Sequence, residues 1–161
     1  MSRSERYADE FEAAQDEFIR LITSLSDEQW RRVGKNSPQR LNDEDEGRTV
    51  GVIAHHVAVS GPLIIERIQR MLDGRPLEPL DFRALNARHA AEHREVTKED
   101  VIRLLNGTRS PIADAVRAIP DDQLDQMRDT PVGPMSVAQR LESVLVGHIK
   151  THQSSIEAAL A

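Results

Sequence analysis

The sequence predicts an all-α protein: a four-helix bundle with long connections and short extra helical turns. Apolar residues recur at helical spacing through several long segments, and no segment shows sustained strand alternation. Serine, threonine or aspartate stands where most of these segments begin, as is typical of helix N-caps. The chain has 161 residues, enough for one hydrophobic core, so we expect a single domain over residues 1–161.

The first long helix is expected over residues 4–24, with Ser4 as a candidate cap. Its apolar positions lie at helical spacing and are Tyr7, Phe11, Ala14, Phe18, Leu21 and Ile22. A short capped turn at residues 26–30 follows and carries Trp30. Residues 34–48 contain glycine, proline and an acidic run but almost no apolar period, which predicts a solvated loop.

The second long helix is expected to begin after Thr49 and to end near Leu72. A third helical segment covers residues 81–95. Thr97 then caps a further long helix that is expected to end near Ile119.

The last helix is expected over residues 136–160, opened by a serine–glutamine capping box. It carries His148 and His152, which lie four residues apart and therefore on one face. The same ridge holds Val144 and Ile156, so both imidazoles are expected at the edge of the core. A metal ion can engage two buried imidazoles at once, whereas hydrogen bonding within the core is the alternative that the residues leave open.

The composition excludes several classes of function. The net charge is −6 with the charges interspersed, and aromatic residues are only 3%, so we expect no nucleic-acid partner. The chain has no cysteine, so a metal must be bound by histidine or carboxylate, and a reactive thiol must come from a substrate. No apolar stretch is long enough to span a membrane, and the first residues lack a signal core, which favours a cytoplasmic location.

The second long helix carries two adjacent histidines, His55 and His56, and its periodicity does not distinguish them. The stretches Thr49–Val57 and His148–His152 resemble the two metal-binding segments of the DinB-like (DinB/YfiT) superfamily. The resemblance covers most of the chain and includes the turn Asp27-Glu28-Gln29-Trp30 and the central Leu85-Asn86-Ala87. In this superfamily the first histidine usually stands seven residues after the cap, which selects His56.

The resemblance implies a DinB-like bundle with a divalent metal, zinc or nickel, bound by His56, His148 and His152. Three imidazoles leave coordination positions open for water or substrate, as in catalytic sites. The superfamily includes thiol-dependent isomerases of the maleylpyruvate isomerase type and S-transferases, in which the metal is thought to activate a low-molecular-weight thiol. Some thiol-dependent members carry a carboxylate where this chain has His148.

The resemblance therefore implies a metal-dependent enzyme, either a thiol-dependent transferase or isomerase or a hydrolase, acting on a small molecule that the sequence does not identify. Two alternatives stay open: a non-catalytic metal-binding or stress-response protein, and a structural bundle with histidines in its core. Glu66 and Glu142 are candidate acids or bases, but neither is assigned, and the catalytic residues are unknown.

His89 and His93 form a second pair four residues apart, on a shorter and more polar helix. The polar periodicity around them favours a surface or rim pair over a metal site.

A homodimer is also expected, because apolar residues wrap more than one stripe of the second and last helices. These residues are Leu63, Ile64, Ile65, Val144, Leu145, Val146 and Ile149.

Overall fold

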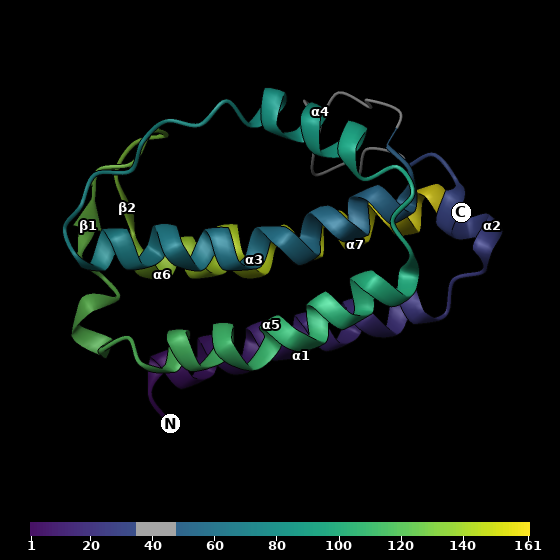
Figure 1. The fold of residues 1–161 in the computed structure, drawn as a ribbon. Helices are drawn as coiled ribbons and strands as arrows, with labels where there is room; N and C mark the ends of the chain where they lie inside the picture. Colours follow the sequence, from purple (N-terminus) through teal and green to yellow (C-terminus); the bar gives the residue numbers. More distant parts are fainter. Residues whose placement is uncertain (35–47) are drawn as a thin grey trace.

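The computed structural model describes residues 1–34 and 48–161 of the chain (Figure 1). Its longest helices are α1 (Arg3–Thr23), α3 (Val50–Leu72) and α5 (Lys98–Arg117). The last helical stretch consists of α6 (Val137–Arg140), a π-helical segment (Leu141–Val146) and α7 (Gly147–Leu160). The predicted all-α class is confirmed, whereas the loop predicted over residues 34–48 lies almost entirely outside the described residues.

The shorter elements stand at the ends of the long helices or beside them. They are α2 (Asp27–Arg31), α4 (Phe82–Glu92), a 3₁₀ turn (Asp121–Gln123), and the strands β1 (Met127–Arg128) and β2 (Met135–Ser136). The two strands pair antiparallel, with Met127 opposite Ser136. This strand pair is not predicted from the sequence, because two residues are too few to show an alternating pattern.

Side-chain caps set the start of each long helix. The Thr49 hydroxyl accepts from the backbone N–H of Val52 at the start of α3. Ser136 begins the last helical stretch with a complete capping box, as predicted. The predicted cap of α1 is wrong by two residues: Ser2 caps the helix, whereas the buried Ser4 hydroxyl donates to the carbonyl of Ile119.

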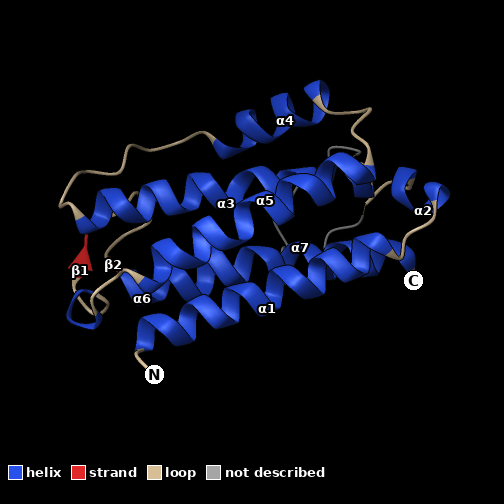
Figure 2. Ribbon diagram, turned by 60° about the horizontal axis from the view of Figure 1, so that its bottom comes forward, coloured by secondary structure: helices blue, strands red, loops and turns tan. Residues whose placement is uncertain are grey.

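The core lies between two pairs of helices. Helices α1 and α5 run side by side, α3 and α7 form the neighbouring pair, and α4 lies on the outer side of that second pair (Figures 1 and 2). The largest fully buried apolar side chains of the core are Phe11, Phe18, Ile22, Ile68, Met71, Leu105, Leu124, Leu141, Leu145 and Ile156. Helix α4 contributes no buried residue to this core.

Trp30 ties α2 to the first turn of α3. A Cβ atom on Gly51 would lie 2.6 Å from the indole ring, so the backbone of α3 approaches the ring as only glycine allows. The indole Nε1 donates to the carbonyl of Val96 at 3.0 Å, just before α5. Trp30 therefore joins α2, the first turn of α3 and the residue Val96 before α5.

Within residues 1–34 and 48–161, no helix has both the length and the apolar character needed to cross a bilayer.

The apolar surface on which the homodimer is predicted is largely buried within the chain itself. Ile64, Leu145, Val146 and Ile149 belong to the core, so they are not excess surface. Leu63 is 41% exposed and Val59, one turn before it on α3, is 38% exposed.

The homodimer stays a prediction that now depends on this exposed ridge of α3. We expect light scattering at micromolar concentration to give twice the chain mass, and Leu63→Asp to shift the mass toward the monomer by placing a charge in the interface. A monomer mass for the unchanged protein would contradict the prediction.

Candidate metal centre

Helix α3 carries the two adjacent histidines at the centre of the site. Adjacent residues on an α-helix point about 100° apart around its axis. The His56 ring lies against His148 and His152 of α7, whereas the His55 ring lies against His89 of α4 and against His93, the residue that ends it. The six histidines of the chain therefore fall into two groups of three.

The first group, which we call the α3–α7 trio, consists of His56, His148 and His152. One ring nitrogen from each lies within 4.8 Å of the others. The Nε2 atoms of His56 and His148 are 3.0 Å apart, and His152 is 1% exposed. Two nitrogens bound to tetrahedral zinc at about 2.0–2.1 Å lie about 3.3 Å apart, so the donor atoms fit an ion after small movements. These are the three residues that the sequence predicts.

A π-helical segment directly precedes the two histidines of α7. The backbone N–H of Gly147 donates to the carbonyl of Glu142, five residues earlier, instead of four. This extra residue turns the following helix by about 100° relative to an uninterrupted α-helix. The ridge of His148 and Ile156 therefore does not continue directly through Val144, which is only partly buried.

Gly147 permits this turn. A Cβ atom at this position would lie 3.0 Å from the carbonyl oxygen of Glu142, the acceptor of the π-helical bond. That oxygen belongs to the backbone and cannot rotate away as a side chain would. No residue within Leu141–Val146 distinguishes this segment from a regular helix, so the sequence predicts one continuous helix and the π turn is not foreseen.

The two candidate acids or bases, Glu66 and Glu142, lie in environments that differ from that of the α3–α7 trio. The Tyr7 hydroxyl donates to Oε1 of Glu142 at 2.7 Å, and burial is the main cause that raises the pKa of Tyr7. Glu66 is exposed on α3. Within the described residues, neither carboxylate belongs to a group whose donor atoms could converge on an ion.

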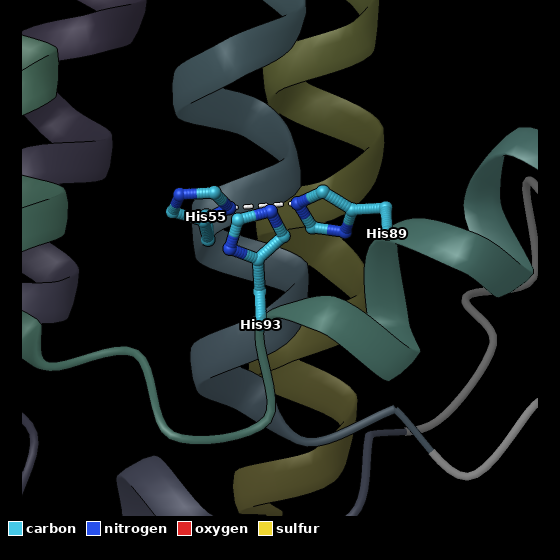
Figure 3. Close-up of side chains that lie close together, drawn as sticks. All are labelled: His55, His89 and His93. Atoms are coloured by element: carbon cyan, nitrogen blue, oxygen red, sulfur yellow. Dashed lines mark hydrogen bonds between the residues drawn. The ribbon is translucent and has the colours of Figure 1, made fainter.

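The second group, which we call the α3–α4 trio, consists of His55, His89 and His93 (Figure 3). Its three donor nitrogens also lie within 4.8 Å of one another, and His55 Nδ1 is 2.7 Å from His89 Nε2. The ring centroids are 4.9 Å apart for His55 and His89, 4.2 Å for His55 and His93, and 4.7 Å for His89 and His93.

The expectation of a surface or rim pair at His89 and His93 is incomplete, because both rings are partly buried against the buried His55. Burial lowers the pKa of His55, and burial together with the neighbouring charges of His55 and His93 lowers the pKa of His89 to about 4. The lowered pKa values of His55 and His89 favour the neutral imidazole, the form that binds metal ions. Helical periodicity cannot predict this grouping, because it joins residues across the connection between α3 and α4.

A scan against protein-family models matches this chain over residues 10–156 to the model of the DinB superfamily. The chain belongs to the DinB superfamily. The resemblance found in the sequence motifs is thereby confirmed at the level of the superfamily, and the matched range contains all six histidines. Comparisons with curated proteins and with solved structures find no match.

The π-helical turn leads to a prediction about two glycines in helices. Gly107 in α5 is exposed, and no atom lies within 4 Å of a Cβ built there, so Gly107→Ala should stabilise the protein by roughly 0.5–1 kcal/mol. Gly147→Ala should instead destabilise it by about 1–3 kcal/mol, because the methyl group crowds the Glu142 carbonyl.

Urea unfolding of both variants beside the unchanged protein measures these free energies. Equal stabilisation by the two substitutions would contradict the role assigned to Gly147.

Proposed function

We propose that this DinB-superfamily protein binds a divalent metal ion, zinc or nickel, through His56, His148 and His152. The observation that carries the proposal is the convergence of three imidazole nitrogens from two helices within 4.8 Å. Imidazole is a favoured ligand for both zinc and nickel. Cysteine is absent from the chain, and within residues 1–34 and 48–161 only histidine supplies donors to this trio.

The burial of the three histidines suits a metal site with an open coordination position. His152 is fully buried, whereas His56 and His148 are only partly buried, so a ligand could approach from their side. A divalent ion held there acts as a Lewis acid and lowers the pKa of a thiol or water that occupies an open position. We infer a metal-dependent enzyme acting on a small molecule, either a thiol-dependent transferase or isomerase, as in the maleylpyruvate isomerase type, or a hydrolase.

A specific observation favours a second candidate, a non-catalytic metal-binding or stress-response protein. General acid–base catalysis requires a group within hydrogen-bond reach of the reacting atoms. Among the described residues, Glu142 accepts from Tyr7, and neither Glu142 nor Glu66 joins the donor atoms of the α3–α7 trio. The homodimer and the cytoplasmic location stay predictions under either function.

The first test measures metal content in protein purified without a polyhistidine tag. His152→Ala should lose one ion per chain by elemental analysis, because removing a direct ligand weakens binding beyond the roughly 10–100-fold typical of an outer-shell partner. Gln153→Ala is the matched control: this neighbour on α7 donates to Glu17 and Glu157 and should keep the full content. An unchanged metal content in His152→Ala would contradict the proposed ligand set.

The second test separates the two candidate functions. The metal-loaded protein is assayed with a panel of low-molecular-weight thiols and small electrophiles, and separately with ester and amide substrates. An enzyme should show turnover that disappears in His152→Ala and persists in Gln153→Ala. Equal background rates for the loaded protein and His152→Ala on every substrate would favour the non-catalytic protein.

A further inference from the structure

We propose that His55, His89 and His93 form a second binding site for a divalent transition-metal ion of the zinc class, separate from the α3–α7 trio. The two trios share no residue, and each brings three imidazole nitrogens within 4.8 Å of one another. In the α3–α4 trio, all three rings turn toward a common space between the two helices (Figure 3).

Hydrogen bonding alone does not account for this trio. A neutral imidazole has one donor nitrogen and one acceptor nitrogen. The contact between His55 Nδ1 and His89 Nε2 uses one nitrogen of each ring. The remaining nitrogen of His89, Nδ1, is buried and has no hydrogen-bond partner among the described residues. Hydrogen bonding within the trio thus joins only two of the three rings, whereas a cation shared by one nitrogen of each ring would engage all three.

The surroundings of the trio favour a metal ion over a proton as that cation. His55 is 7% exposed, and the nearest ring centroids are only 4.2 Å apart. A proton placed on one imidazole would be desolvated and would lie close to two further groups that can carry positive charge. A divalent ion distributes its charge over three nitrogen lone pairs, and imidazole suits zinc, nickel and copper.

Within residues 1–34 and 48–161, burial in the core does little to hold helix α4 against α3. None of its residues is buried, and its large apolar side chains Phe82 and Leu85 are 54% and 44% exposed. Helix α4 lies outside the packed helices (Figure 2). Because core burial does not fix it, an ion shared by His55, His89 and His93 would clamp α4 onto α3.

The two sites lie close enough to influence each other. The rings of His56 and His89, one from each trio, have centroids 5.8 Å apart. Divalent ions held by two neighbouring trios repel each other, so the second zinc ion should bind more weakly than the first.

The test titrates zinc into metal-stripped, tag-free protein by calorimetry and counts bound ions by elemental analysis. The unchanged chain should bind two ions in two steps. His89→Ala, His93→Ala and His152→Ala should each bind one ion, and the double variant with His89→Ala and His152→Ala should bind none. Arg88→Ala is the control on α4, because Arg88 is exposed and pairs only with Glu92 among the described residues; this variant should bind two.

A second measurement reports on α4 directly. Zinc should slow hydrogen exchange of the backbone amides of residues 82–92 in the unchanged chain and in His152→Ala, but not in His89→Ala. Because α4 buries no side chain in the core, His89→Ala should leave the circular dichroism and melting temperature of the metal-free protein unchanged.

The outcomes distinguish this inference from the proposed function. A single ion that is kept by His89→Ala and lost by His152→Ala would overturn the second site and leave the α3–α7 trio standing. A single ion that is lost by His89→Ala and kept by His152→Ala would support the second site and overturn the first.

Discussion

The approach of α3 to α7 is the interaction on which both histidine trios depend. It places His56 Nε2 3.0 Å from His148 Nε2, and it leaves His55, on the adjacent face of α3, turned toward α4. Apolar side chains of the two helices, among them Ile68 and Ile156, are fully buried in the core. The histidines of α3 and α7 are therefore positioned by helices that pack into the hydrophobic core, and rigid elements hold a constellation more closely than loops do.

The parts of the fold that local pattern determines could be predicted from the sequence. Thr49 and Ser136 cap the helices they were expected to cap, because a cap is recognised within four residues. The α3–α7 trio could be predicted because His148 and His152 share a helical face, and the family resemblance chose between His55 and His56. The α3–α4 trio could not, since nothing in a helical period relates His55 to residues more than thirty positions away.

A pocket of about 1090 Å³ lies between α4 and the starts of α3 and α5. Helix α4 forms one of its walls. Ala84, Ala87 and Ala91 line it from α4, and Trp30 and Thr49 line it from the other side, but none of the histidines does. His89 and His93 lie on the side of α4 that meets α3. A change in how α4 sits on α3 would therefore alter the shape of this pocket as well as the second trio.

The π-helical segment sets a condition on insertions and deletions in the last helical stretch. Removing one residue between Leu141 and Val146 would let the backbone return to regular α-helical bonds. Because a π-helical turn accommodates one extra residue in about the same rotation and rise as an α-helical turn, the parts on either side of the deletion would keep their relative orientation. By contrast, a regular α-helix of unchanged length would rotate Ser136, which caps this stretch and pairs with Met127, by about 100° and shift it by about 1.5 Å relative to His148. With this number of residues in the stretch, the π-helical turn therefore allows the strand pair at one end and the imidazoles at the other to keep their places together.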